Sequence, residues 1–208
     1  MLYIFDKINL LKNDYPKSVE YLLSEQRLEK VGRIKSQEGK KVSASVYVLL
    51  RLALYDAFDI KEAVVFDFLD RGKPYLKDYP HIRFNLSHSG NTIACALSGN
   101  EVGVDVQTIR RVTEKTAKRV LTGDEFLIYQ DSSDKDDYFS KIWTIKESYL
   151  KKTGAGLTVE LNEISAAEIK NIKIHKKNDY YCSVCGDEMK IRNIGRNKFE
   201  QFSNGQIN

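Results

Sequence analysis

The sequence has few cysteines and no long hydrophobic run. Its three cysteines, Cys95, Cys182 and Cys185, are too few and too unevenly spaced for a disulfide framework, which fits a reducing compartment. No apolar run approaches the roughly 20 residues that a membrane-spanning helix needs. The first residues lack the basic region and the long apolar stretch of a signal peptide. We therefore expect a cytoplasmic protein without a membrane partner.

The sequence also lacks internal repeats and any linker rich in proline or glycine. With 208 residues, of which 42% are hydrophobic and 30% charged, the chain can bury a core as one large domain or two small ones. A soft boundary near residues 100–103 predicts an N-terminal half, residues 1–102, and a C-terminal half, residues 103–208. We expect a monomer.

Positive charges exceed negative charges only slightly, and the formal net charge is +4. A basic run nevertheless extends through residues 110–119. It fits an acidic partner or a polyphosphate, and it equally fits a solvated helix face. A nucleic-acid-binding protein is a third interpretation. The low net charge and the lack of a recognised binding motif argue against nucleic acid as a partner.

Hydrophobic periodicity predicts both helices and strands. Apolar residues recur every three to four positions over residues 42–58, which predicts a core helix, and Ser24 is expected to cap an earlier helix. Residues 93–97 and 101–107, separated by Gly99-Asn100, predict a hairpin. Residues 138–152 have helical spacing, with glycines at 154 and 156 to end the helix. The tail after Arg192 is polar, which favours disorder.

Two acidic side chains stand out against this background. Asp105 and Gln107 share one face of the predicted strand, and Glu147 shares a helix face with Trp143 and Lys151. An exposed pair of Glu147 and Lys151 would contribute only about 0.3–0.5 kcal/mol. If Asp105 and Glu147 converge, however, their oxygen atoms would suit a hard cation such as Mg²⁺ that also binds a phosphate.

Three segments together strengthen this interpretation. They are Asn85-Leu86-Ser87-His88-Ser89, residues 102–107, and residues 143–151 followed by Gly154-Ala155-Gly156-Leu157. In this order and at this spacing they resemble the Sfp-type 4′-phosphopantetheinyl transferases, and the resemblance extends over residues 24–157. It implies an α+β fold, the 4′-phosphopantetheinyl transferase fold, with two similar α/β halves related by a pseudo-twofold axis. Coenzyme A, the co-substrate, would lie between the halves.

The resemblance also implies roles for individual residues. Arg27 and Lys30 match cations near the 3′-phosphate of coenzyme A, and Lys73 matches a lysine near the adenine end. Ser87 and His88 match a pair that contacts the 3′-phosphate or the pyrophosphate. The family tends to have an arginine where Val42 stands, and Lys40 or Lys41 is a candidate replacement.

The implied metal ligands are Asp105, Glu147 and Gln107, where Gln107 stands in place of an acid that is usual in the family. A neutral amide oxygen is a weaker ligand for a hard cation than a carboxylate. Glu147 is the candidate base for the attacking serine, and Lys151 would lie by the pyrophosphate and stabilise its growing charge.

The function implied is a Mg²⁺-dependent transfer of the phosphopantetheine arm of coenzyme A to a serine of an acyl or peptidyl carrier protein. The alternative is a non-catalytic module of the same fold that binds coenzyme A or a carrier protein. The apolar residues Ala117, Val120, Leu121 and Phe126 fit either core packing or contact with an acidic carrier-protein helix.

Overall fold

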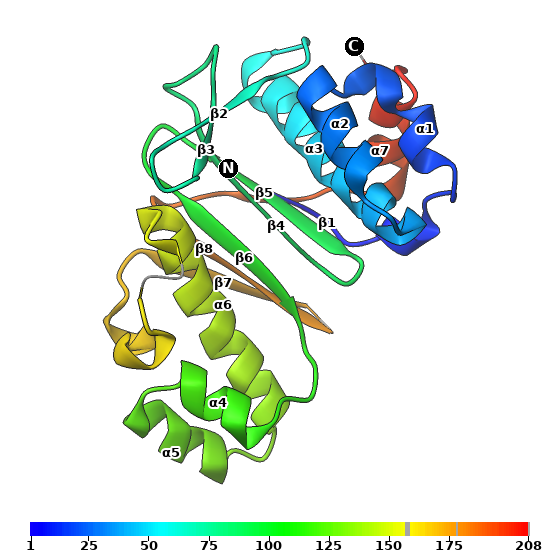
Figure 1. The fold of residues 1–208 in the computed structure, drawn as a ribbon. Coiled ribbons are helices and arrows are strands. Elements are labelled where there is room, and N and C mark those ends of the chain that lie inside the picture. The colour runs from blue at the N-terminus through cyan, green and yellow to red at the C-terminus, as the bar shows by residue number, and fades with distance from the viewer. Residues whose placement is uncertain (157–158, 178, 208) are drawn as a thin grey trace.

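The protein folds into two β-sheets that lie between two groups of helices (Figure 1). The computed structural model describes residues 1–156, 159–177 and 179–207. Helices α1, α2, α3 and α7 cover the outer face of one sheet, and α4, α5 and α6 lie on the far side of the other. The predicted α+β class is confirmed.

The first group of elements forms the upper part of Figure 1. Its elements in chain order are β1 (Leu2–Phe5), α1 (Tyr15–Ser18), α2 (Glu25–Arg33), α3 (Gln37–Phe58), β2 (Phe66–Phe68), β3 (Pro74–Leu76), β4 (Arg83–Ser89) and β5 (Thr92–Ser98). The hydroxyl of Ser24 accepts the backbone N–H of Arg27, which confirms the predicted cap. Strands β2 and β3 form a separate two-stranded hairpin.

The rest of the chain contains the predicted acidic residues. Its elements are β6 (Gly103–Thr108), α4 (Glu114–Val120), α5 (Gly123–Asp131), α6 (Lys135–Thr153), β7 (Ile172–Lys177), β8 (Tyr180–Cys185), β9 (Ile191–Asn193) and α7 (Arg196–Ser203). The α6 helix ends as predicted at Gly154, whose φ of 67° is left-handed and so favours glycine.

Alternation along β1 explains how the layers pack. Tyr3 and Phe5 point into the core beneath α3, whereas Leu2 and Ile4 point into a second core that lies between the sheets. Val104 of β6 and Val184 of β8 join this second core from the other sheet. Because both faces of β1 are buried, its four residues are all apolar or aromatic.

The sheet order corrects the predicted hairpin of residues 93–97 and 101–107. The orders are β4-β5-β1-β9 in one sheet and β6-β8-β7 in the other. β5 pairs with β4 and β1, and β6 leaves to pair with β8. Gly99-Asn100 lies between the two strands as predicted, but there the chain crosses from one sheet to the other. It does so because the apolar faces of both β5 and β6 are buried in the core between the sheets.

The polar tail was also predicted wrongly. After Arg192 the chain forms α7, in which Phe199 and Phe202 are buried and the Phe199 ring stacks on Phe5 at 4.1 Å. β9 adds to β1 in parallel. Two aromatic side chains thus order a segment whose average composition favours disorder.

β9 and α7 therefore pack with the N-terminal half, although they come after the boundary predicted at residues 102–103. That division and the pseudo-twofold relation between the halves remain predictions, which a superposition of the halves would test. Within the three described ranges, no helix is long and apolar enough to cross a membrane.

Candidate active site

Helix α6 crosses strand β6 at Gly103, and this crossing brings the acidic residues together. A Cβ atom added to Gly103 would lie 2.0 Å from the carbonyl oxygen of Ser148 and 2.3 Å from the backbone nitrogen of Lys152. A larger residue therefore cannot fit without displacing the helix. Gly103 and Asp105 share a strand face, so α6 holds Lys151 against Asp105.

Asp105, Lys151 and Ser87 form a buried polar cluster. The Lys151 ammonium lies 2.6 Å from Asp105 Oδ1 and 3.1 Å from Ser87 Oγ. Ser87 Oγ donates to Asp105 Oδ1 at 3.0 Å and accepts the backbone N–H of Val106 at 3.1 Å. With one donor and two lone pairs in use, the Ser87 hydroxyl is saturated. The Ser87 hydroxyl therefore positions Asp105. Ser87 also lines the neighbouring cavity.

Side chains of β4 hold β6 in place from the other sheet. The backbone N–H groups of residues 104, 106 and 108 donate, in that order, to side-chain oxygens of Asn85 at 2.9 Å, Ser87 at 3.1 Å and Ser89 at 3.0 Å. These bonds replace a backbone ladder between the strands. The Asn-x-Ser-x-Ser spacing of the motif therefore fixes the position of the strand that carries Asp105.

Glu147 faces the same cluster from α6. Burial raises the pKa of Glu147, the negative charge of Asp105 raises it further, and Lys151 opposes both effects. The expected ion pair between Glu147 and Lys151 is not formed, because the Lys151 ammonium bonds to Asp105 and Ser87 instead. Within the described residues, the Glu147 carboxylate has no hydrogen bond or ion pair and is available to a ligand.

The residues of this cluster fit a hard cation. Asp105 Oδ2 is buried without a hydrogen-bond partner among the described residues, and burial raises the pKa of Asp105 against the effect of Lys151. The Gln107 amide nitrogen donates to the Thr108 carbonyl at 2.9 Å, which leaves its amide oxygen as an acceptor. The described residues hold no group of three or more His, Cys, Asp or Glu suited to a metal, and Gln107 is not one of these residue types.

A cavity of about 970 Å³ opens beside the cluster. Its walls come from α2, the N-terminal part of α3, the β2–β3 hairpin and the end of β4. The lining includes basic, acidic, polar and apolar residues: Arg27, Lys30, Arg33, His88, Glu29, Glu38, Ser43, Ser87, Val42, Val46, Phe66, Phe68 and Leu86. Ser87 lines the cavity and bonds to Asp105 and Lys151, so the two sites are continuous.

Arg27 lies in the cavity wall as a buried cation. Its guanidinium is 5.1 Å from the Tyr47 ring centre and 5.3 Å from that of Phe66, and only 7% of the residue is exposed. Burial lowers the pKa of Arg27. No carboxylate within the described ranges pairs with it, so an anion entering the cavity would meet a desolvated positive charge.

The cavity contains two further predicted residues, Lys30 and His88. The pKa of Lys30 lies below its ordinary value through burial and the charge of Arg27. The pKa of His88 is lowered by desolvation and then by the positive charge of Lys151. In both residues desolvation is the larger cause of the lowered pKa, and the positive charges of Arg27 and Lys151 add to it. The structure therefore brings Arg27, Lys30, Ser87 and His88 to one cavity.

Ser43 is a cavity residue that the sequence analysis did not identify. Its hydroxyl is buried and has no hydrogen-bond partner in the part of the chain that the structure describes, and Ser43 lines the cavity next to Val42. The available signal was a small polar residue near the start of an otherwise apolar core helix. An unpaired hydroxyl in a basic cavity is suited to a phosphate oxygen.

Two predicted residues lie elsewhere. Lys41 is 5% exposed and is not part of the cavity lining, although it pairs at 3.0 Å with Glu38, which is. The Lys73 ammonium bonds to Glu101, to the carbonyl of Lys152 and to that of Val102. Leu157, the last residue of the matching motif, falls outside the described residues.

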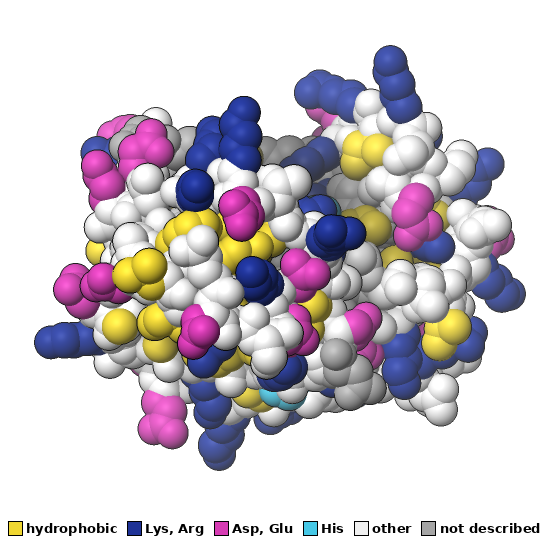
Figure 2. All heavy atoms as spheres, turned by 90° about the horizontal axis from the view of Figure 1, so that it is seen from below, with side chains coloured by type: hydrophobic (Ala, Val, Ile, Leu, Met, Phe, Trp, Pro, Cys, Tyr) yellow, Lys and Arg dark blue, Asp and Glu magenta, His cyan; other side chains and the backbone are white. Residues whose placement is uncertain are grey.

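For Ala117, Val120, Leu121 and Phe126 the sequence left core packing and carrier-protein contact open, and Phe126 is partly buried against the same core as the other three. Ala117, Val120 and Leu121 are 0–4% exposed in the core beneath α6, so core packing accounts for them. On α5, Leu127 and Ile128 are exposed, at 64% and 55%. Figure 2, which views the molecule from below, shows apolar side chains gathered on this side among Lys, Arg and acidic residues.

Comparison with known proteins identifies relatives of one family. Residues 101–191 match the model of the 4′-phosphopantetheinyl transferase superfamily. The 4′-phosphopantetheinyl transferase Sfp of Bacillus subtilis (strain 168) is 30% identical over 146 residues, which cover 69% of this chain and 65% of the relative. The 4′-phosphopantetheinyl transferase HetI of Nostoc sp. is 33% identical over 154 residues, which cover 70% of this chain and 65% of the relative.

A more distant relative comes from an animal. The L-aminoadipate-semialdehyde dehydrogenase-phosphopantetheinyl transferase of Xenopus laevis is 24% identical over 196 residues, covering 78% of this chain and 62% of the relative. The chain thus spans a little under two thirds of the length of the relatives it matches. It is similar to the Sfp-type enzymes, and its residues 101–191 match the model of the 4′-phosphopantetheinyl transferase superfamily.

Proposed function

We propose that the chain transfers the 4′-phosphopantetheine group of coenzyme A to a serine of an acyl or peptidyl carrier protein. One observation carries the proposal: Ser87, which bonds to Asp105 and Lys151, also lines a cavity that contains the cations Arg27 and Lys30. The similarity to phosphopantetheinyl transferases supports the same activity.

In this proposal the cavity binds the nucleotide end of coenzyme A. Arg27, Lys30 and His88 supply positive charge or hydrogen-bond donors for phosphate groups, and the Ser43 hydroxyl is a further donor. The apolar wall of the cavity, which includes Val46 and Phe66, suits the face of an adenine ring. The pyrophosphate would then lie at Ser87, where the cavity meets Lys151.

The transfer is a substitution at phosphorus. The serine oxygen of the carrier protein forms a bond to the phosphorus that bears the pantetheine arm. The bond from this phosphorus to the bridging oxygen breaks, and adenosine 3′,5′-bisphosphate leaves with the electron pair. Glu147 accepts the serine proton, which its raised pKa favours. Lys151 stabilises the negative charge that grows on the bridging oxygen.

Asp105, Glu147 and the Gln107 amide oxygen are the proposed ligands of Mg²⁺. When bound, this ion supplies Lewis-acid stabilisation of the pyrophosphate oxygens. The orphaned Oδ2 atom of Asp105 and the mutual repulsion of Asp105 and Glu147 both support cation binding there. Lys73 and Lys41 have no role in this proposal as direct ligands of coenzyme A.

The alternative is a module of the same fold that binds coenzyme A or a carrier protein without catalysis. Gln107 favours it, since an amide replaces a carboxylate in the ligand set. Intact-mass analysis separates the two functions: purified protein, coenzyme A and Mg²⁺ are incubated with several apo carrier proteins. One added phosphopantetheine group supports the enzyme. No addition to any carrier, with thermal protection by coenzyme A, would support the binding module.

The proposal includes a cytoplasmic, monomeric protein that acts on a carrier protein and has no nucleic-acid partner. The low cysteine content supports a reducing compartment. A complete set of Asp105, Glu147 and Lys151 within one chain supports a monomer. Sedimentation analysis would test the monomeric state. Salt-dependent retention on DNA or RNA would reveal a nucleic-acid partner.

A further inference from the structure

The β2–β3 hairpin forms one wall of the cavity but has little structure of its own. Phe66, Phe68 and Pro74 of the hairpin line the cavity. Its two strands have three residues each and, among the described residues, pair only with one another. An isolated two-stranded hairpin is marginally stable in water, so contacts with the rest of the protein must hold this wall in place.

One end of the hairpin is held by Gln26 of α2. The Gln26 amide nitrogen donates to the Phe66 carbonyl at 3.1 Å, and its amide oxygen accepts the Phe66 N–H at 3.2 Å. This paired arrangement imitates one step of a strand ladder. It leaves the turn end, residues 69–73, to be held by another contact.

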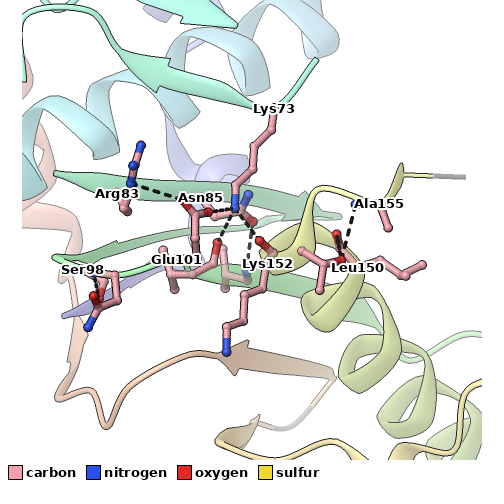
Figure 3. A network of polar contacts seen from close by, with 12 residues as sticks. Lys73, Arg83, Asn85, Ser98, Glu101, Leu150, Lys152 and Ala155 are labelled. Carbon is pink, nitrogen blue, oxygen red and sulfur yellow. Dashed lines mark hydrogen bonds and ion pairs between the residues drawn. The ribbon is translucent and has the colours of Figure 1, made fainter. Parts of the chain in front are cut away.

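That contact is the side chain of Lys73, which reaches down from the turn into a polar network (Figure 3). The ammonium lies 2.5 Å from Glu101 Oε2, 2.7 Å from the Lys152 carbonyl and 3.4 Å from the Val102 carbonyl. Only 11% of the Lys73 side chain is exposed. Three protein oxygens thus satisfy the three donors of the ammonium.

The partners of Lys73 are themselves fixed. Arg83 of β4 holds Glu101 from the other side at 3.2 Å. The Lys152 carbonyl belongs to the last turn of α6, where unpaired carbonyls and the helix dipole attract a cation. Lys152 follows Lys151, so the tip of the hairpin is tied to the helical turn that reaches Asp105.

We propose that Lys73 is a positioning residue that latches the cavity wall to the end of α6, and that it acts on coenzyme A binding through the hairpin rather than by contacting the coenzyme. This inference rests on the proposed function, because it takes the cavity as the coenzyme site. The latch keeps Phe66 and Phe68 over the cavity in register with Lys151.

The latch can be tested without a ligand. Hydrogen exchange is measured by NMR for the Leu69 amide, which donates to the Lys73 carbonyl across the turn at 3.0 Å. In Lys73→Met this amide should exchange at least about tenfold faster, while amides of α3 are unchanged. Lys77→Met, an exposed charge next to the same hairpin, should match the wild type. Unchanged Leu69 exchange in Lys73→Met would overturn the latch.

Coenzyme A affinity, measured by calorimetry, separates a latch from a direct ligand. Lys73→Met should weaken binding about tenfold, because charged hydrogen bonds are lost. Glu101→Ala should weaken it in the same direction, the double variant should be no weaker than Lys73→Met, and Lys73→Arg should recover part of the affinity. If Glu101→Ala binds as well as the wild type or better, the freed Lys73 contacts the coenzyme directly and the proposal is wrong.

The two measurements also distinguish this inference from the proposed function. If the wild-type protein does not bind coenzyme A, the proposed function fails, and so does the effect of the latch on coenzyme binding. The exchange of Leu69 would still report whether Lys73 holds the hairpin.

Discussion

Lys146 is the neighbour of Glu147 in the sequence but points to a different side of α6, toward α4 and α5. Its side chain is fully buried, and its ammonium lies 2.5 Å from Glu125 Oε2, 2.7 Å from the Val120 carbonyl and 3.1 Å from the Leu161 carbonyl. It therefore joins α4, α5 and the segment after α6 to the helix that carries the proposed base. The substitution Lys146→Met keeps most of the side-chain volume and removes only this charge.

The loss should be large because Glu125 would remain buried without its counter-ion. Removing one partner of a buried ion pair costs about 3–5 kcal/mol, and in a chain of this size each kcal/mol lowers Tm by roughly 2–4 °C. Calorimetry should therefore show Tm lower by about 6–20 °C. Urea unfolding should show a matching loss of free energy.

A matched control distinguishes this effect from loss of any lysine on α6. Lys141→Met removes an exposed charge of the same helix and should change the free energy of unfolding by less than about 0.5 kcal/mol. The double variant Lys146→Met/Glu125→Met should recover part of the lost stability, because no buried charge remains. A loss below about 1 kcal/mol in Lys146→Met would contradict the importance of the buried pair.

Three other predictions concern the site itself. Ser43→Val should weaken coenzyme A binding about fivefold by calorimetry, since it removes one hydrogen bond, whereas Ser43→Thr should retain the wild-type affinity; equal affinity of both variants would exclude a coenzyme contact. Gln107→Glu should retain transfer or raise it at low Mg²⁺, and a loss of transfer in a titration of Mg²⁺ would argue against a metal ligand at this position. Because burial and Asp105 raise the pKa of Glu147 in the folded state, its ionisation above the ordinary value near 4.3 destabilises the fold as pH increases. Glu147→Gln should therefore raise Tm at pH 7 and leave it unchanged near pH 3, and a lower Tm at pH 7 would contradict this sign.

Much of the fold could be predicted from local patterns. The 3.6-residue period of α3 and the capping residue Ser24 each specify a local structure, and both are confirmed. The pairing of β6 with β8 could not be predicted, since Val104 and Val184 meet only through the core between the sheets. Such long-range pairing depends on tertiary packing, which alternation within one strand does not encode.

The sequence predicted which residues form the site better than it predicted the contacts between them. The resemblance nominated Asp105 and Lys151, and the structure joins them at 2.6 Å. The pair expected from helical spacing, Glu147 with Lys151, is absent because a buried carboxylate on a neighbouring strand competes successfully for the ammonium. Gly103, which permits this approach, gave no chemical signal in the sequence.

Lys73 illustrates the same distinction. A lysine in a Gly-Lys-Pro turn is typical of an exposed loop, and only the position of the α6 carbonyls reveals that its side chain is buried. The sequence could nominate this residue by resemblance, but its partners come from segments 28 and 79 residues away.

The assignment of Asp105, Glu147 and Lys151 as a transferase site is tested most directly by intact-mass analysis of an apo carrier protein. The carrier is incubated with coenzyme A, Mg²⁺ and either the wild-type protein or Glu147→Gln. We predict that the wild type adds one phosphopantetheine group and that Glu147→Gln adds none while still binding coenzyme A. A fully active Glu147→Gln would contradict the assignment.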